Sequence, residues 1–279
     1  MNERTILITG CSSGIGRACA LGMRARGWRV LATARREEDI EELRGLGLEA
    51  LYLDYDDPRS IEACVGEVAR LTHGRLEALF NNGAWGQPGA LEDVSREVLR
   101  AQFETNVFGW HDLTRQVIPM MRAQGGGRIV NNSSVLGLVA MKWRGAYNAS
   151  KFAIEGLSDT LRLELRGSGI HVSLIEPGPI FSKFMETALR KFEEHIDIEH
   201  SPHREIYLRH RERLSGRRRP SRFKLPPEAV LKKLIHAVES PRPKPRYFVT
   251  FPTHLMALLR RALPTRALDV VLDRSSDAN

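Results

Sequence analysis

The residues with the clearest capacity for chemistry are Tyr147 and Lys151, which stand four positions apart. They begin a helical pattern, so their side chains would share one helix face, about one turn apart. A free phenol titrates near pH ~10, too high for ready proton exchange at neutral pH. A lysine ammonium beside the phenol favours the phenolate and lowers its pKa. The spacing therefore predicts that Tyr147 serves as a general acid and base.

A glycine-rich turn near the N-terminus is the second feature with chemical meaning. An apolar run at residues 5–9 leads into the turn, and a helical stretch at residues 17–26 follows it. Glycines let a backbone approach a pyrophosphate closely, and free N–H groups at a helix start attract it. The alternative is a tight turn that binds nothing. The predicted phosphate contacts are Gly10, Ser12, Ser13, Gly14, Ile15, Gly16 and Arg17.

The spacing of these glycines, G-x-x-x-G-x-G preceded by Thr9, resembles that of the short-chain dehydrogenase/reductase family. The resemblance extends over residues 5–182 and includes the tyrosine and lysine pair. It implies that Ser134, thirteen residues before Tyr147, hydrogen-bonds a substrate carbonyl. It also implies that Asn106 holds a water that links the lysine to solvent. The alternatives are a turn serine and an asparagine satisfied within its helix.

The resemblance implies further contacts with a nicotinamide dinucleotide. Ser182 stands where the family has a threonine that holds the nicotinamide carboxamide, and Asp54 stands where the family contacts the adenine amino group. An aspartate at a strand end is also a common turn residue. The family reads Asn-Asn-Ala-Gly where this chain reads Asn-Asn-Gly-Ala at residues 81–84, so we expect a differently shaped loop beside the ribose. The implied cofactor contacts are Asp54, Asn81, Gly83, Tyr147, Lys151, Pro177, Gly178, Ile180 and Ser182.

The end of the second predicted strand favours NADP(H) over NAD(H). Dinucleotide folds use an acidic residue there to bind the ribose 2′-hydroxyl, whereas an arginine accommodates a 2′-phosphate. This strand ends in Thr-Ala-Arg-Arg, with no carboxylate at the tip. Arg35, helped by Arg17, would make the charge-assisted contacts that a phosphate favours. The alternative is that both are ordinary surface charges.

Bulky apolar residues gather after the predicted strands, where open α/β sheets bind ligands. We expect them to wall a pocket for an apolar substrate, although about half are expected to be core or dimer contacts. The candidates are Trp85, Leu136, Met141, Trp143, Phe181 and Phe184, with Met185 beside them.

Short apolar runs alternate with longer amphipathic stretches along the whole chain, which predicts a single-domain α/β Rossmann-type fold, doubly wound, with a seven-stranded parallel sheet. A continuous helix is expected at residues 95–122, with Ser95 as its N-cap, and another at 147–166. Residues 181–225 depart from the pattern and are interpreted as a basic insertion at the substrate edge. The predicted strands are Thr5 to Thr9, Arg29 to Thr33, Ala50 to Leu53, Leu76 to Phe80, Arg128 to Asn132, His171 to Ile175 and Arg246 to Thr250.

The net charge of +8 comes from one part of the chain. Residues 190–246 carry 16 Lys and Arg against 8 Asp and Glu, with an arginine run at residues 217–219. Such a segment attracts anionic lipid, nucleic acid or an acidic substrate, or it is a solvated surface. Residues 252–272 form an amphipathic tail that lies on a membrane or, as we favour, packs against the sheet or a partner subunit.

The three cysteines form no C-x-x-C pair, so neither a disulfide framework nor a metal site is expected. The first apolar run is too short for a signal peptide or membrane span. We therefore expect a cytoplasmic protein, with peripheral contact at the inner membrane surface as a further option.

Three classes of function remain. The leading one is an NADP(H)-dependent oxidoreductase for an aldehyde, ketone, retinoid or steroid-like alcohol, because the chain resembles the steroid and retinol dehydrogenase branch and its bacterial aldehyde-reductase relatives. The second is a non-catalytic NADP(H)-sensing protein, which would need neither Tyr147 nor Lys151. The third, nucleic-acid binding through residues 204–224, lacks the interleaved aromatics that base stacking uses. The resemblance also implies a homo-oligomer, a dimer or tetramer, formed through the helices that carry Asn106 and Tyr147.

Overall fold

Seven short apolar runs form one parallel sheet, as the sequence predicts. The computed structural model describes residues 4–214 and 222–278. The strand order is β3-β2-β1-β4-β5-β6-β7, and every neighbouring pair is parallel. Near-continuous burial along the strands is typical of a parallel sheet covered on both faces. The strands are β1 (Thr5–Ile8), β2 (Arg29–Ala34), β3 (Glu49–Tyr52), β4 (Ala78–Asn81), β5 (Gly127–Asn132), β6 (Ile170–Glu176) and β7 (Arg246–Phe248).

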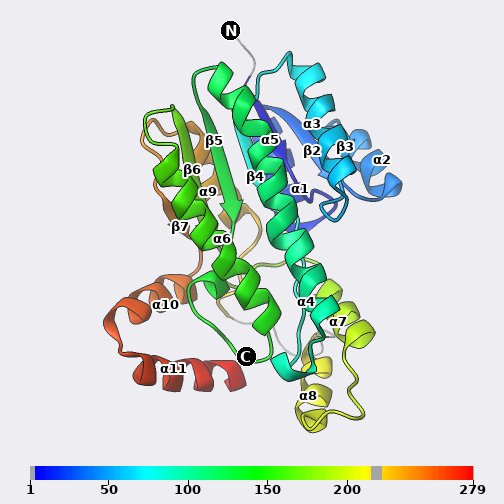
Figure 1. The fold of residues 1–279 in the computed structure, drawn as a ribbon, viewed down its shortest axis with the longest axis vertical. Helices are drawn as coiled ribbons and strands as arrows, with labels where there is room; N and C mark the ends of the chain where they lie inside the picture. The colour runs from blue at the N-terminus through cyan, green and yellow to red at the C-terminus, as the bar shows by residue number, and fades with distance from the viewer. Residues whose placement is uncertain (1–3, 215–221, 279) are drawn as a thin grey trace.

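Helices cover both faces of this sheet (Figure 1). They are α1 (Gly14–Ala25), α2 (Glu37–Gly45), α3 (Pro58–Thr72), α4 (Arg96–Phe103), α5 (Gly109–Ala123), α6 (Gly145–Glu164), α7 (Phe184–His195), α8 (Arg204–Leu214), α9 (Glu228–Glu239), α10 (Phe251–Ala262) and α11 (Thr265–Ala278). The buried side chains of α1, α2 and α9 form one apolar cluster with the sheet. Those of α3, α5 and α6 form a second cluster on the opposite face. The fold is therefore the predicted doubly wound one.

The predicted helix at residues 95–122 is interrupted. Ser95 caps α4 as predicted, since its hydroxyl accepts a hydrogen bond from the N–H of Val98 at 3.3 Å. A π-helical turn, η2 (Glu104–Phe108), then separates α4 from α5. Thr105 and Asn106, which belong to this turn, are both buried. Apolar periodicity does not reveal one extra residue in a single turn, and such turns are frequent at functional sites.

Two strand boundaries differ from the prediction by two residues, and the others differ by at most one. β4 begins at Ala78 instead of Leu76, because the side-chain amide of Gln124 binds both backbone groups of Leu76, at 2.9 and 2.7 Å. The last strand ends at Phe248, since Thr250 already serves as the N-cap of α10. In both places a capping or side-chain contact replaces a strand partner.

The predicted insertion and tail are both helical, and both lie beyond the carboxyl ends of the strands (Figure 1). The insertion contains α7 and α8, which share a small apolar core centred on Phe192 and Tyr207. The arginine run at residues 217–219 lies outside the described residues. The tail forms α10 and α11, and α11 binds the loop before α6 through an ion pair between Asp273 and Lys142. No helix within these described ranges is both long and apolar enough to cross a membrane.

Candidate active site

The glycine turn after β1 is held against the loop after β4. Gly10 has a φ of +67°, and a Cβ there would lie 2.5 Å from the Cα of Gly83. The hydroxyl of Thr9 accepts hydrogen bonds from the N–H groups of Asn82 at 2.8 Å and Gly83 at 3.1 Å. The phenol of Tyr55 donates to the same hydroxyl at 2.9 Å. Glycine is therefore required at position 10 by both space and backbone angle.

Gly83 and Ala84, which stand in the reverse of the family's order, change the packing of the loop after β4 only slightly. A Cβ at Gly83 would lie 3.3 Å from the backbone nitrogen of Gly10 and 3.3 Å from the ring of Tyr55, which is tight but not forbidding. Gly83 also lacks the positive φ that would demand glycine. The exchange therefore relaxes a close contact and leaves the turn in place.

The side chain of Asn81, a predicted cofactor contact, points into the protein instead. Its side chain is fully buried and turned into the protein, where its amide donates to Thr114 and Asn131, each at 2.9 Å. Its oxygen accepts from the phenol of Tyr55 at 3.0 Å. Residue 81 ends β4 with its side chain on the inner face, so it holds neighbouring elements together. The next residue, Asn82, instead binds the backbone oxygens of the glycine turn.

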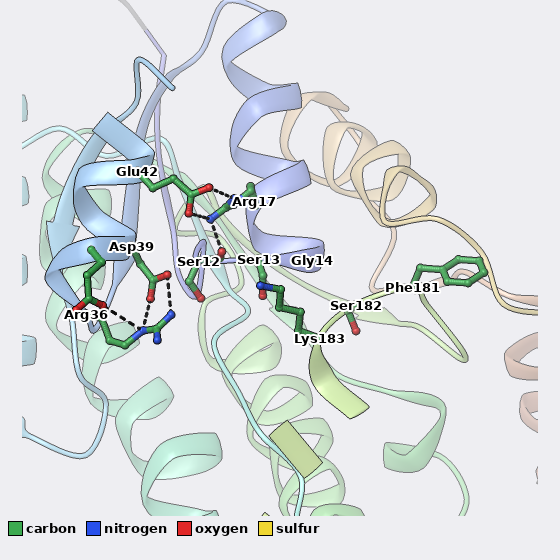
Figure 2. Close-up of a pocket in the computed structure, with 11 residues that line it drawn as sticks. Ser12, Ser13, Gly14, Arg17, Arg36, Asp39, Glu42, Phe181, Ser182 and Lys183 are labelled. Carbon is green, nitrogen blue, oxygen red and sulfur yellow. Dashed lines mark hydrogen bonds and ion pairs between the residues drawn. The ribbon is translucent and has the colours of Figure 1, made fainter. Parts of the chain in front are cut away.

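A cavity of about 620 Å³ opens beside the glycine turn (Figure 2). Its walls come from the turn, from α2 and from the segment after β6, and they include three cations and three carboxylates. The lining residues are Ser12, Ser13, Gly14, Arg17, Arg36, Glu38, Asp39, Glu42, Phe181, Ser182 and Lys183. The N-cap side chain of α1, Ser13, makes no capping hydrogen bond. The start of this helix, open to the cavity, fits the pyrophosphate of a dinucleotide.

The cations around this cavity differ from those predicted. Arg17 forms two hydrogen bonds with Glu42, at 2.6 and 2.7 Å, and this contact lowers the pKa of the Glu42 carboxyl. Arg36 forms a similar pair with Asp39, at 2.7 and 3.0 Å. Both arginines are thus already paired with carboxylates. Lys183, which the sequence analysis missed, follows the predicted Ser182 and adds a third positive charge to the lining.

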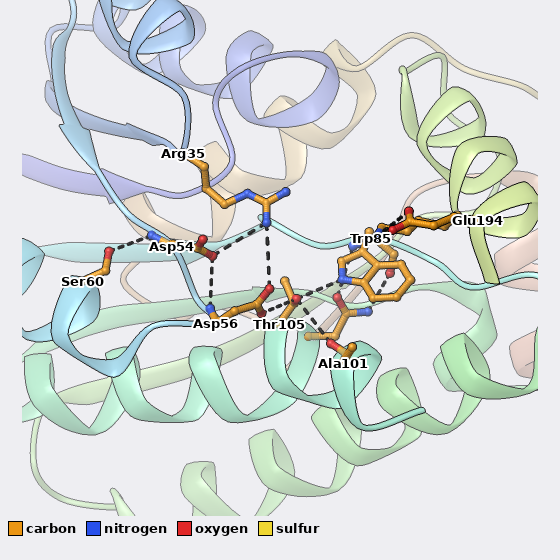
Figure 3. Close-up of polar contacts among 10 residues, drawn as sticks. Arg35, Asp54, Asp56, Ser60, Trp85, Ala101, Thr105 and Glu194 are labelled. Carbon is orange, nitrogen blue, oxygen red and sulfur yellow. Dashed lines mark hydrogen bonds and ion pairs between the residues drawn. The ribbon is translucent and has the colours of Figure 1, made fainter. Parts of the chain in front are cut away.

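Arg35 lies at the tip of β2 but away from this lining (Figure 3). Its guanidinium is 3.7 Å from Asp54 and 3.9 Å from Asp56, and it is more than half exposed. Asp56 accepts a hydrogen bond from the Thr105 hydroxyl at 2.5 Å, and Thr105 accepts one from the Trp85 indole at 2.9 Å. A chain of contacts therefore links the tip of β2 to the π-helical turn.

Tyr147 and Lys151 share one face of α6, as predicted from their spacing. The Lys151 ammonium lies 5.7 Å from the centre of the Tyr147 ring and 4.3 Å from that of Trp110. It donates to the backbone oxygen of Asn132 at 2.8 Å. Ser134 follows β5 and hydrogen-bonds the Tyr147 hydroxyl. These three residues are thus brought together at the carboxyl end of β5.

Burial controls the titration of both groups. It raises the pKa of Tyr147 to about 12, and the hydrogen bond with Ser134 opposes the shift. It lowers the pKa of Lys151 to about 7, and the Glu155 carboxylate opposes that shift. The spacing of the two residues predicts instead that the lysine lowers the tyrosine pKa. In this structure desolvation outweighs the neighbouring charge, because burial disfavours the charged form of each group.

Asn106, for which the resemblance implies a bound water, binds two neighbouring elements of the chain directly. Its amide oxygen accepts from the N–H of Trp85 at 3.2 Å, and its nitrogen donates to the Trp85 carbonyl at 2.8 Å. The same nitrogen donates to the Ser150 hydroxyl at 3.2 Å, and Ser150 donates to the Tyr147 carbonyl at 2.8 Å. Asn106 therefore joins the loop after β4 to the first turn of α6.

The comparisons with known proteins agree with this geometry. A family model described as short chain dehydrogenase matches residues 4–193. The chain belongs to the short-chain dehydrogenase family. The "Uncharacterized oxidoreductase YbbO" of Escherichia coli (strain K12) is 42% identical over 270 residues, which cover 97% of this chain and 94% of that protein. The "17-beta-hydroxysteroid dehydrogenase type 1" of Homo sapiens is 34% identical, covering 94% of this chain and 82% of its own length.

Solved structures of the family show the same fold. A Burkholderia phymatum short chain dehydrogenase/reductase in complex with NAD has a TM-score of 0.78 at 27% identity, over 97% of this chain and 95% of that one. An actinorhodin polyketide ketoreductase variant with NADPH has a TM-score of 0.72 at 29% identity, over 88% of this chain and 95% of that one. Relatives of this dehydrogenase thus bind either nicotinamide dinucleotide.

The segment after β6 joins the two halves of the dehydrogenase site. The carbonyl of Pro177 accepts from the N–H of Val135, which ties this segment to the loop of Ser134. A Cβ at Gly178 would lie 2.2 Å from the Thr250 hydroxyl. Ile180 bridges to Leu225, and both Ile180 and Ile15 pack against the apolar core. A Cβ at Gly14 would lie 2.9 Å from that of Ser182, so the segment closes over the glycine turn.

The predicted substrate residues separate into two groups. Phe184 lies with its ring centre 5.3 Å from that of Tyr147, and Phe181 lines the cavity. Leu136 is buried beside Ser134, to whose hydroxyl its N–H donates. These three border the site.

The other three candidates serve neighbouring structure. Trp85 is buried by its contacts with the π-helical turn. Trp143 has a φ of +64° and packs its ring against those of His203, Tyr207 and His210 around α8. The sulfur of Met141 accepts a contact from Arg144. Met185 joins the same small core as Trp143.

A buried ion cluster behind the site escaped the sequence analysis. Arg246 of β7 contacts Glu176 at 2.8 Å and Asp159 at 2.6 Å, and it also pairs with Glu155. Burial raises the pKa of Glu176 to about 8. Glu155 lies four residues after Lys151 on α6, so this cluster borders Lys151. Its partners are up to 91 residues apart, which no local pattern reveals.

Proposed function

We propose that this dehydrogenase is an NADP(H)-dependent enzyme that interconverts a carbonyl group and an alcohol on an apolar substrate, an aldehyde, ketone, retinoid or steroid-like molecule. The observation that carries the proposal is the convergence of Ser134, Tyr147 and Lys151 at the end of β5, next to the cavity beside the glycine turn. A protein that only sensed the cofactor would need no phenol and lysine paired in this way.

The residues of the chain supply the proton chemistry, while the bound nicotinamide supplies or accepts a hydride. A Tyr147 hydroxyl with a pKa of about 12 is protonated at neutral pH, so it can deliver its proton to the carbonyl oxygen in the reductive direction. Ser134 would hydrogen-bond the same oxygen and orient it. The Lys151 ammonium would stabilise the phenolate that remains.

Residues of the chain would also hold the cofactor. The start of α1 and the neighbouring Lys183 would hold the pyrophosphate, and Ser182 would hold the nicotinamide carboxamide, as the resemblance implies. The preference for NADP(H) rests on this chain's own residues, because relatives bind either form. Arg35 at the tip of β2 is paired at 3.7 Å or more and remains largely exposed, so it is available to a 2′-phosphate.

An apolar substrate is supported by the groups near the reactive hydroxyl. Phe184 lies beside Tyr147, and Leu136 is next to Ser134. The human relative named as a hydroxysteroid dehydrogenase acts, by that name, on a bulky apolar alcohol. We also propose a homo-oligomer, a dimer or tetramer, through the segments that carry Asn106 and Tyr147, where Phe108 of η2 and Leu157 and Leu163 of α6 are exposed.

The test is a steady-state assay of reduced-cofactor oxidation with NADPH and with NADH, against long-chain aldehydes, steroids and retinal. Tyr147→Phe should lower kcat/KM on the order of 10²- to 10⁴-fold while leaving NADPH binding intact. Tyr52→Phe, which alters an exposed tyrosine on β3, is the matched control. Tight NADPH binding without turnover of any substrate would instead favour the sensing protein.

A further inference from the structure

Helix α10 turns an apolar stripe toward solvent. Phe251, Leu255 and Leu258 are spaced at i, i+4 and i+7, so they share one helix face. Phe251 is 62% exposed and Leu258 63% exposed. The opposite face carries Thr253, which is fully buried, and Ala257, which is half-buried. The helix is thus anchored by its other side, and its more apolar face has no cover within the described chain.

The stripe continues onto a neighbouring segment of the chain. The ring of Phe251 stacks on that of Phe223, with centres 5.5 Å apart. The segment of Phe223 then pairs with the strand-like stretch after β6, where the N–H of Phe181 donates to the Leu225 carbonyl at 2.9 Å. Phe181 is itself 46% exposed. Phe181, Phe223, Phe251, Leu255 and Leu258 together form what we call the apolar strip.

Positive charges border the apolar strip. The Arg222 guanidinium lies 4.7 Å from the centre of the Phe223 ring, and the Lys224 ammonium lies 4.6 Å from that of Phe181. Arg261 is exposed on α10. Residues 222–225 and 251–263, which carry most of the strip, contain no Asp or Glu. A partner surface with dispersed negative charge over an apolar interior matches this combination.

We propose that the apolar strip binds the surface of an anionic phospholipid bilayer. Aromatic and leucine side chains would enter the boundary between headgroups and acyl chains, while the bordering cations attract the anionic headgroups. Figure 1 shows α10 beyond the carboxyl ends of the strands, on the side of the molecule that also carries the site. Because Phe181 lines the cavity as well as the strip, docking would place the mouth of the cofactor cavity beside the bilayer, a consequence that rests on the proposed function.

The experiment is co-sedimentation of the full-length protein with vesicles of phosphatidylglycerol and phosphatidylcholine, or of phosphatidylcholine alone. Wild-type protein should bind the anionic vesicles, and binding should weaken as salt screens the charges. The double variant Phe251→Ser, Leu258→Ser should bind at least about tenfold more weakly. This assay requires no catalytic activity, so its outcome is independent of the proposed reaction.

The matched control is Leu46→Ser combined with Tyr52→Ser, which removes one exposed leucine and one exposed aromatic at the β3 edge of the sheet, opposite β7. This control should bind anionic vesicles as the wild type does. Failure of the wild-type protein to bind them would overturn the proposal, as would equal loss in both double variants. Light scattering measures the oligomeric state of each protein. If the Phe251→Ser, Leu258→Ser variant forms a smaller assembly than the wild type, a second copy of the chain covers the strip and the proposal is wrong.

Discussion

Lys151 should weaken the folded protein most below about pH 7, and replacing it by methionine should reveal how this effect changes with pH. Burial lowers the pKa of its ammonium from 10.5 to about 7. The unfolded chain therefore binds a proton between these values that the folded chain does not. Stability rises with pH wherever the unfolded state binds more protons, here by up to about 1.4 kcal/mol per pH unit. Below pH 7 both states are charged and the penalty is complete.

The expected magnitude follows from this window. When the pH is raised from about 7 to about 9, the loss of this penalty should raise the free energy of unfolding of the wild type by about 2 kcal/mol. Lys151→Met keeps a side chain of similar length and removes the titration. Glu176, with a pKa raised to about 8, is present in both proteins, so its own pH dependence cancels in the difference. Over this pH range the free energy of unfolding of the wild type should therefore rise by about 2 kcal/mol relative to that of Lys151→Met.

Urea denaturation followed by tryptophan fluorescence at both pH values measures the difference directly. Lys232→Met, which alters an exposed lysine of α9, is the control, and because it keeps Lys151 its free energy of unfolding should change with pH as that of the wild type does. Parallel stability curves for the wild type and Lys151→Met would refute the argument that burial neutralises this lysine near pH 7.

Three further outcomes follow from other contacts. Arg246→Met leaves buried carboxylates without their partner and should reduce the free energy of unfolding by about 3–5 kcal/mol in urea denaturation. Gly10→Ala should abolish NADPH binding in a fluorescence titration, whereas Gly83→Ala should weaken it less than about tenfold, because the first Cβ meets backbone at 2.5 Å and the second at 3.3 Å. Glu42→Gln should release Arg17 and raise the ratio of NADPH to NADH affinity several-fold, about the effect of one charge-assisted contact; an unchanged ratio would mean that Arg17 does not reach the 2′-phosphate.

The sheet and the glycine turn could be predicted because each depends on residues close in sequence. Buried strands are continuous apolar runs, and the turn needs glycine at fixed positions whatever lies around it. The face shared by Tyr147 and Lys151 follows from helical geometry alone. The identity of the fold was therefore available from the sequence, together with the residues that converge at the end of β5.

Contacts between distant residues could not be predicted in this way. Nothing near Arg17 indicates that Glu42, on the next helix, binds it with two hydrogen bonds. The orientation of Asn81 depends on Thr114 and Asn131, which α5 and β5 bring to it. The exposed face of α10 reads in the sequence as an ordinary buried stripe. Composition reports which face is apolar, and only the packing shows whether something covers it.

The pKa values of Tyr147 and Lys151 decide which protonation states of the site are present at neutral pH. Burial favours the neutral phenol of Tyr147 and the neutral amine of Lys151, so the proton that a carbonyl oxygen needs is in place at neutral pH. Oxidation requires the phenolate, which gains stability only while Lys151 is charged. Raising the pH deprotonates the lysine at about 7, well before the tyrosine at about 12. Reduction also leaves a phenolate when Tyr147 gives up its proton, so on the proposed mechanism both directions depend on positive charge beside Tyr147.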